Sequence, residues 1–190
     1  MSKAPDRRIR KTKHAIKETL IALLKEKPVR EISVIELSDR ADINRGTFYL
    51  HYKDIFDLLE QIEQEFFGKL KEIMNSYTIQ DLNGSPLPLL EGIFHLLEEN
   101  VSLCIVLLSP NGSLSFINQL KDMIREICFD HWSYLFHKDK NAVFEYYYSY
   151  MLSGCIGLIE TWLLNEKRES PEEIALLVQD MVMRGIEVLK

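Results

Sequence analysis

Apolar residues recur at the three- and four-residue spacing of an α-helix along almost the whole chain, and this periodicity restricts the fold to an all-helical one. Convincing runs of alternating apolar and polar residues, which would indicate half-buried strands, are absent. Most of the 8 glycines and 6 prolines fall between periodic segments, where they would end helices. We therefore predict an all-α protein of about nine helices.

Capping residues and breakers predict where these helices begin and end. The expected helices cover residues 7–26, 34–40, 45–51, 55–75, 87–99, 101–108, 115–136, 141–165 and 171–189. Pro171 followed by Glu172 and Glu173 is typical of a helix start, because proline suits the first helical position and acids suit the first turn. The segment 81–88 is the best candidate for a linker, and 109–112 predicts a break.

The charge of the chain is divided unevenly along its length. Residues 1–53 contain 13 Lys and Arg against 7 Asp and Glu, whereas 54–190 contain 10 against 22. The overall charge of −6 therefore conceals a basic N-terminal part. A basic part on an acidic protein predicts contact with a polyanion at one end, although a solvated basic helix would give the same pattern.

Two short helices follow the first helix within this basic part. Ser33 is the expected N-cap of one, with Glu36 three residues later completing a capping box, and Asn44 is the expected N-cap of the other. Only residues 41–43 separate them, which is the proportion of a helix-turn-helix. The residues expected to pack inside it are Leu37, Ala41, Ile43 and Phe48.

The second short helix would present side chains suited to a DNA groove. Arginine pairs with guanine edges, threonine offers a hydroxyl and a methyl group, and tyrosine reaches phosphate oxygens. The expected exposed residues are Arg45, Thr47, Tyr49 and His51. Gly46 costs about 1 kcal/mol relative to alanine in a helix, and close approach of its backbone to DNA would account for it.

The stretch 32–54, ISVIELSDRADINRGTFYLHYKD, closely resembles the DNA-binding domain of the TetR/AcrR family of transcriptional regulators. The run RGTFY followed by HYK is highly specific to that family, and the resemblance covers about the first third of the chain. Ser38 replaces a common alanine. Asp42 replaces a common glycine in the turn, where aspartate tolerates left-handed backbone better than most residues.

The resemblance implies a helix-turn-helix domain over 1–53, followed by a helical regulatory and dimerisation domain over 54–190. It implies DNA contacts by Ser33, Val34, Asn44, Arg45, Gly46, Thr47, Tyr49, His51, Tyr52 and Lys53. The last two helices would pair across a dimer axis through Ser153, Gly154, Gly157, Leu158, Trp162, Leu177 and Met181. Ordinary packing within the chain would account for some of these residues.

The helices between would enclose a pocket for a small organic effector, again by resemblance. Candidate lining residues are Phe94, His95, Cys104, Leu108, Phe116, Cys128, His131, Trp132 and Tyr147. Plain core positions for the apolar residues, and surface positions for the two histidines, fit the sequence as well. The expected function is a repressor that binds a palindromic DNA operator as a homodimer and is released by the effector. The alternative is a regulator or co-activator whose helical body binds a partner protein.

Other classes of protein find little support in the sequence. We see no nucleophile elbow, no glycine-rich phosphate loop and no metal-ligand spacing, so we expect neither an enzyme nor a cofactor or metal site. Glu160 and three adjacent tyrosines make 146–164 a buried or interface helix rather than a membrane span. Three scattered cysteines and the lack of a secretory leader pattern predict a bacterial cytoplasmic protein associated with the nucleoid.

Overall fold

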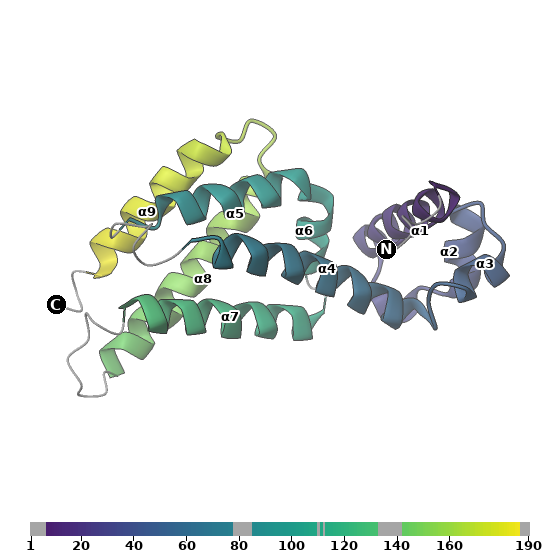
Figure 1. The fold of residues 1–190 in the computed structure, drawn as a ribbon, viewed down its shortest axis with the longest axis horizontal. Helices are drawn as coiled ribbons and strands as arrows, with labels where there is room; N and C mark the ends of the chain where they lie inside the picture. The colour runs from purple at the N-terminus through teal and green to yellow at the C-terminus, as the bar shows by residue number, and fades with distance from the viewer. Residues whose placement is uncertain (1–6, 78–84, 110, 112, 133–141, 187–190) are drawn as a thin grey trace, which may run out of the picture. The chain divides into compact units, whose positions relative to one another are not determined.

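The structure is a computed structural model that describes the backbone of residues 7–77, 85–109, 111, 113–132 and 142–186. Side chains are described for all of these except 127–132, 142–144 and 186. Every regular element in these ranges is a helix (Figure 1), which confirms the all-α prediction. Most of the linker predicted at 81–88, and the helix ends predicted at 133–136, 141 and 187–189, lie outside the described residues.

The helices follow the predicted bounds closely. They are α1 (Arg7–Glu26), α2 (Val34–Arg40), α3 (Arg45–Tyr49), α4 (Ile55–Asn75), α5 (Leu87–Glu99), α6 (Val101–Leu108), α7 (Leu114–Trp132), α8 (Ala142–Leu164) and α9 (Pro171–Ile186). A short 3₁₀ helix, η1 (Val29–Glu31), was not predicted. The prediction for α3 was wrong at its end, because Leu50 and His51 form a hydrogen-bonded turn rather than a continuation of the helix.

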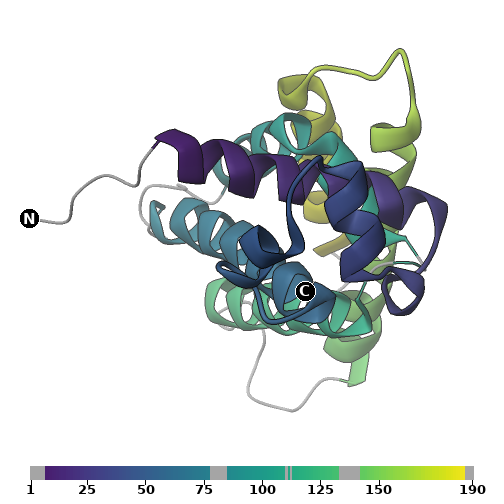
Figure 2. The ribbon, with the colours of Figure 1, turned by 90° about the vertical axis from the view of Figure 1, so that its right-hand side faces the viewer.

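The chain divides into two compact units. Unit 1 contains Met1–Gly68 and Val106–Ser113, and unit 2 contains Lys69–Ile105 and Leu114–Lys190. The helices α4 and α6 each contribute to both units. Unit 1 gathers α1, α2 and α3 around the first turns of α4 (Figure 2).

The core of unit 1 forms because helical spacing places the apolar residues of α1 on one face. Its fully buried side chains include Ile16, Leu20, Leu23, Leu24, Leu37, Phe48 and Leu58. Ile9, which we expected on the same apolar stripe, is 41% exposed. The stripe is therefore buried only from the third turn of α1 onward, because the first turns extend beyond the helices that cover the rest.

Ser38 is an anomaly in this core. Its side chain is fully buried, and among the described residues its hydroxyl has no hydrogen-bond partner. A buried hydroxyl without a partner costs about 1–3 kcal/mol, and alanine is also the better helix former. We expect Ser38→Ala to raise the free energy of unfolding by about 1–2 kcal/mol in urea denaturation. Ser33→Ala is a matched control of opposite sign, because it removes the α2 cap at a cost of about 1 kcal/mol. A destabilised Ser38→Ala would show that the hydroxyl has a partner in solution.

Glu63 of α4 is the second buried polar residue of unit 1. Within the described part of the chain its Oε1 has no hydrogen-bond partner, and Ser113 binds the same carboxyl group. Burial raises the pKa of Glu63, while the hydrogen bond from Ser113 opposes this shift. Asn111 Nδ2 also donates to the Leu24 carbonyl at 3.2 Å, so polar contacts join the 106–113 segment to both α1 and α4.

A carboxyl group whose pKa is raised by folding binds its proton more tightly in the folded state. The free energy of unfolding should therefore fall as pH rises from the unfolded value near 4.5 through the folded pKa. We expect Glu63→Gln to abolish this dependence, so that the variant exceeds the parent in stability at neutral pH and not below pH 4.5. Urea denaturation at several pH values measures the difference, and an equal difference at every pH would contradict the assignment.

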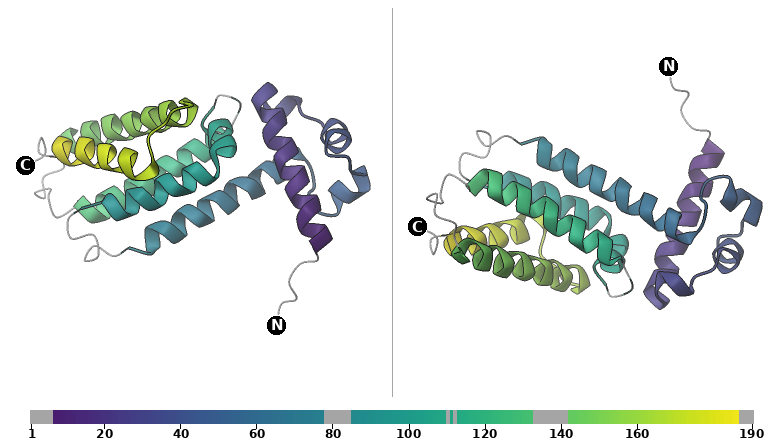
Figure 3. Two further views of the ribbon diagram at one scale, coloured as in Figure 1. Left: turned by 90° about the horizontal axis from the view of Figure 1, so that it is seen from above. Right: turned by 90° about the horizontal axis from the view of Figure 1, so that it is seen from below.

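Unit 2 is a helical bundle in which α9 packs along α5 and also contacts α8 (Figure 3). Phe94 of α5 and Trp162 of α8 meet edge to face, with ring centroids 5.2 Å apart. The Trp162 Nε1 donates to the Glu169 carbonyl at 2.9 Å, and the Arg168 guanidinium lies over the indole ring. These contacts connect the end of α8 to the loop that leads into α9. In the described residues, no helix is long and apolar enough to cross a membrane.

Candidate nucleic-acid interface

The helix-turn-helix begins with two local caps that follow directly from the sequence. The Ser33 side chain accepts a hydrogen bond from the Glu36 backbone N–H at 3.2 Å, which starts α2. The Asn44 Oδ1 accepts from the Gly46 N–H at 2.8 Å, which starts α3. Both caps were predicted, because a short polar side chain at the N-cap satisfies a backbone donor that the helix leaves free. The carboxamide oxygen of Asn44 is thereby occupied within the chain.

The turn between α2 and α3 depends on Asp42. Its φ of 52° lies in the left-handed region, and it is the only positive-φ residue other than glycine in the described part of the chain. Aspartate tolerates this conformation better than most residues, as we expected for this position. The Ile43 N–H then donates to the Ser38 carbonyl at 3.0 Å and closes the end of α2.

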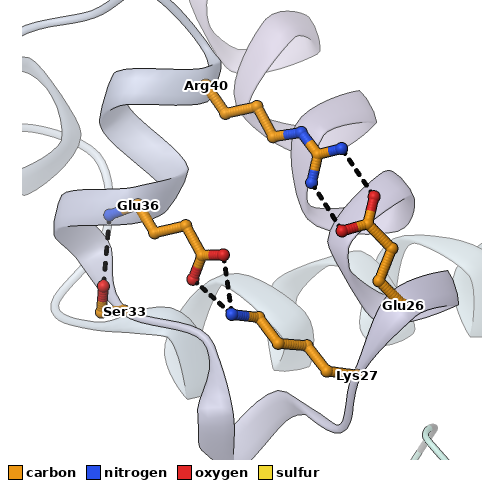
Figure 4. A network of polar contacts seen from close by, with 5 residues as sticks. All are labelled: Glu26, Lys27, Ser33, Glu36 and Arg40. Carbon is orange, nitrogen blue, oxygen red and sulfur yellow. Dashed lines mark hydrogen bonds and ion pairs between the residues drawn. The ribbon is translucent and has the colours of Figure 1, made fainter.

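Two ion pairs connect α2 to the end of α1 (Figure 4). The Arg40 guanidinium binds the Glu26 carboxylate through two hydrogen bonds of 2.9 and 2.6 Å, and this contact lowers the pKa of Glu26. Lys27 Nζ lies 2.7 Å from both carboxylate oxygens of Glu36. Both pairs reach solvent, so we assign them a role in orienting α2 rather than a large contribution to stability.

The exposed surface of α3 carries the side chains that we expected for DNA contact. Arg45 and Gly46 are exposed, Tyr49 is 59% exposed, and Thr47 and His51 are half-buried. Phe48 points the other way and is fully buried. The five-residue helix therefore presents a cation, hydroxyl groups and a glycine on one side while Phe48 anchors it to the core. Leu50 was not expected at this surface, but it is 79% exposed.

Tyr52 was predicted to contact DNA, and the structure corrects this. The residue is only 8% exposed, and its ring lies 5.6 Å from that of Phe48. Burial raises the pKa of its hydroxyl. Lys13 of α1 covers the other part of the ring, with Nζ 5.7 Å from the centroid. Tyr52 therefore belongs to the core, because three elements converge on it.

Lys53 lies at the start of α4, as predicted, and its side chain is exposed. The α4 helix begins with two hydrogen bonds: Asp54 Oδ1 accepts from the Asp57 N–H, and Asp57 Oδ2 accepts from the Lys53 N–H, both at 2.8 Å. The second bond, together with one from Gln61, lowers the pKa of Asp57. This reciprocal pair holds the Lys53 backbone in place, so that its ammonium group projects from a rigid turn.

Comparisons with known proteins bear on both parts of the chain. A family model described as a transcriptional regulator C-terminal region, TetR_C_8, matches residues 84–184, just over half of the chain. The chain belongs to the TetR family of transcriptional regulators. It is 36% identical over 67 residues to the uncharacterized HTH-type transcriptional regulator YxbF of Bacillus subtilis strain 168. That match covers 35% of this chain and only 18% of the relative.

Solved structures agree with this family over almost the whole length. A TetR transcriptional regulator from Streptococcus agalactiae 2603V is similar with a TM-score of 0.62 and 25% identity, over 93% of this chain and 96% of that one. The dihydroxyacetone kinase operon activator DhaS is similar in fold, with a TM-score of 0.58 and 16% identity, over 94% and 98%. The fold and family of this chain are thus those of transcription regulators.

The residues predicted to line an effector pocket fall into different places in this TetR-family regulator. Phe94, Cys104, Phe116 and Tyr147 are buried in unit 2, whereas Leu108 belongs to unit 1. The side chains of Cys128, His131 and Trp132 lie outside the described residues. Burial raises the pKa of the Cys104 thiol to about 12, so this thiol stays protonated and apolar. Tyr147 donates its hydroxyl to the Val182 carbonyl at 2.7 Å.

The pocket prediction was wrong for His95. This residue is exposed on α5, and its Nε2 lies 2.9 Å from Glu172 Oε1 of α9. The carboxylate draws the imidazole to the surface, where both groups remain hydrated. In the described residues, no group of three His, Cys, Asp or Glu residues is placed to hold a metal ion.

The residues predicted at the dimer interface lie mostly at the surface of α8 and α9. Ser153, Gly154, Leu177 and Met181 are exposed, and Gly157 and Leu158 are half-buried. Trp162 is the exception, because its contact with Phe94 places it in the core of its own unit with 2% exposure. A groove of about 350 Å³ runs over this surface, bordered by Gly157, Leu158, Thr161, Trp162, Asn165, Glu169, Ile174 and Leu177.

Sequence reasoning missed several features of the head of this regulator. It did not predict the contact between Lys13 and Tyr52, nor the pairing of Glu26 with Arg40, because each joins residues far apart in the chain. It also assigned no role to the cations of α1. A signal for them was present, since no acidic residue occurs between positions 7 and 17.

Proposed function

We propose that this regulator represses transcription by binding a palindromic DNA operator as a homodimer, and that a small organic effector releases it. In this proposal residues 1–53 read DNA, residues 54–190 dimerise and bind the effector, and the protein acts in the cytoplasm on the nucleoid. The observation that carries it is the exposed α3 surface, held by two capped helices and an unusual Asp42 turn. Nothing in the packing of unit 1 requires Arg45, Gly46 and Tyr49 to face solvent together.

The proposed DNA contacts divide by chemistry. Arg45 would read base edges in the major groove, where a guanidinium binds guanine O6 and N7. Thr47, Tyr49 and Lys53 would bind phosphates and fix the register, with further support from the Ser33–Val34 backbone. His51 would lie at the edge of the groove. A side chain at Gly46 would contact Asn44 Oδ1 at 3.2 Å and would also hold the helix away from DNA.

Dimerisation through α8 and α9 is supported by two glycines. A Cβ added at Gly154 or Gly157 would meet nothing within 4 Å, so packing inside the chain does not require glycine at either position. Each glycine inside a helix costs about 1 kcal/mol relative to alanine. Close approach of a second helix accounts for that cost, and Leu177 and Met181 supply apolar area beside it.

Control by an effector follows from the geometry of a dimer on DNA. Two recognition helices enter successive major grooves on one side of the duplex only when they lie about 34–36 Å apart, or a multiple of this distance. An effector that binds a dimer with a different spacing lowers the affinity for DNA by population shift. The buried side chains of Phe94, Cys104, Phe116 and Tyr147 favour an apolar or aromatic organic effector.

One comparison favours a second candidate function. DhaS, which shares the fold, is named as an operon activator rather than a repressor. In the corresponding proposal for this chain, the helical body binds a partner protein and the bound regulator activates transcription. A promoter fusion assayed with and without the regulator gives the sign of its effect. Thermal-shift screening of small molecules, set against pull-down of a protein partner, distinguishes the two ligand classes.

The test of the main proposal is selection of genomic fragments by the purified protein, followed by gel shift at fixed salt. We expect a short palindrome whose half-site centres lie about 10 base pairs, or a multiple, apart. Salt-sensitive binding without sequence preference would contradict a specific operator. It would indicate an architectural role in place of specific repression.

A further inference from the structure

The first turns of α1 take no part in the core of unit 1. Residues 7–11 are all exposed, and the first buried side chain of the helix is Ile16. Both views of Figure 3 show these turns reaching past α2 and α3. Packing therefore does not explain why the chain continues α1 through residues 7–13, nor which side chains stand there.

Charge within the unit does not explain this segment either. Six of the eleven residues from Arg7 to Lys17 are Lys or Arg, and none is acidic. Cations in the first turn of a helix oppose the helix dipole, at about 0.3–1 kcal/mol each. The first turn of α9 has the favourable arrangement instead, with Glu172 and Glu173. A partner with dense negative charge would relieve the cost in α1.

The contact between Lys13 and Tyr52 places this cationic segment beside the proposed DNA-reading surface. Lys13 Nζ lies over the Tyr52 ring, and Tyr52 directly follows the turn that ends α3. The next residue, Lys53, is a proposed phosphate contact. From Lys13 to Arg7 the helix extends roughly 9 Å further, at about 1.5 Å per residue. That length corresponds to two or three phosphates of one strand, which rise about 3.4 Å each.

We propose that the first turns of α1 form a second DNA contact, in which Arg7, Arg10 and Lys11 bind phosphates flanking the bases read by α3. This inference rests on the proposed function and adds a site to it. The cations act as phosphate ligands and carry no base preference, because their exposed side chains lie on α1 and not on the recognition helix. They increase the affinity for operators embedded in longer duplex.

The experiment measures the salt dependence of binding to the operator duplex recovered by selection. We expect the triple variant Arg7→Gln, Arg10→Gln, Lys11→Gln to lower the slope of log K against log salt by about 2–3, at about 0.9 for each phosphate that is no longer neutralised. Its preference for operator over scrambled duplex stays unchanged. Glutamine preserves helix propensity, so thermal unfolding should match the parent. The charge-matched control is Lys69→Gln, Lys71→Gln, Lys121→Gln, three lysines of unit 2, which should leave the slope unchanged.

Trimming the DNA gives a second, independent readout. On a duplex cut back to the bases read by α3, the parent should fall to the affinity of the triple variant, which itself should not respond to trimming. The double variant Arg7→Lys, Arg10→Lys should retain the full slope, because it keeps the charge.

The outcomes separate this inference from the proposed function. A triple variant with the parent's salt slope and affinity, in a protein whose operator binding is still lost on Arg45→Ala, overturns the α1 contact alone. A parent protein with no sequence-dependent binding overturns the proposed function. Binding of the α1 cations to vesicles containing anionic lipid, with no change on operator DNA, would assign the segment to a membrane surface and overturn the DNA contact.

Discussion

Replacing Leu177 and Met181 together by lysine is expected to convert the protein into a monomer and to weaken operator binding by about 10²–10⁴-fold. The two side chains are 45% and 57% exposed and lie one turn apart on α9, beside the groove that Gly157 and Leu158 border. Two lysines buried against a second copy would leave unpaired charges in an apolar contact. Without a dimer, each helix-turn-helix binds its half-site alone. Analytical ultracentrifugation and gel shift measure the two effects.

The control for this variant keeps its added charge and also removes exposed apolar surface. Leu114→Lys with Gln119→Lys changes two exposed residues of α7, and Leu114 is 77% exposed. This control should remain dimeric and bind the operator as the parent does. If the Leu177 and Met181 variant also remains dimeric, the dimer does not use the α8 and α9 surface. If it becomes monomeric but binds with full affinity, the palindromic two-site mode is wrong.

Arg45→Ala should cost about 1–3 kcal/mol of operator binding and remove the preference for one base at one position of each half-site. Arg45 is exposed at the first position of α3, so its truncation removes no buried packing. Tyr49→Ala should instead weaken binding to all duplexes by a similar factor, because a phosphate contact carries no sequence information. Competition binding of operator against scrambled duplex at fixed salt separates the two effects.

Both substitutions change exposed residues, so the fold should persist and thermal unfolding should match the parent within about 0.5 kcal/mol. Tyr49 also meets Phe48 edge to face, with ring centroids 5.5 Å apart, so the stability of the Tyr49→Ala variant is the one to check first. An Arg45→Ala variant with equally reduced affinity for operator and scrambled duplex would remove this residue from base reading. It would then belong with the phosphate contacts.

The local features of the fold follow directly from the sequence. Ser33, Asn44 and Asp54 each accept a hydrogen bond from a backbone group two or three residues away, and Asp42 adopts its left-handed turn within the same short segment. Such interactions involve only neighbours in the chain, so residue types and spacing suffice to predict them. The all-α class, most helix bounds and the exposed α3 residues were predictable for this reason.

The tertiary structure decided which side chains reach the surface. The sequence alone could not remove Tyr52 from the DNA-contacting residues, since its burial needs Lys13 and Phe48 from other elements. It could not place His95 beside Glu172 or Trp162 against Phe94, and it placed Ile9 in a stripe that other helices do not cover. Helical spacing gives the face on which a residue lies. Whether that face is buried depends on contacts between segments distant in the chain, and only the packed structure defines them.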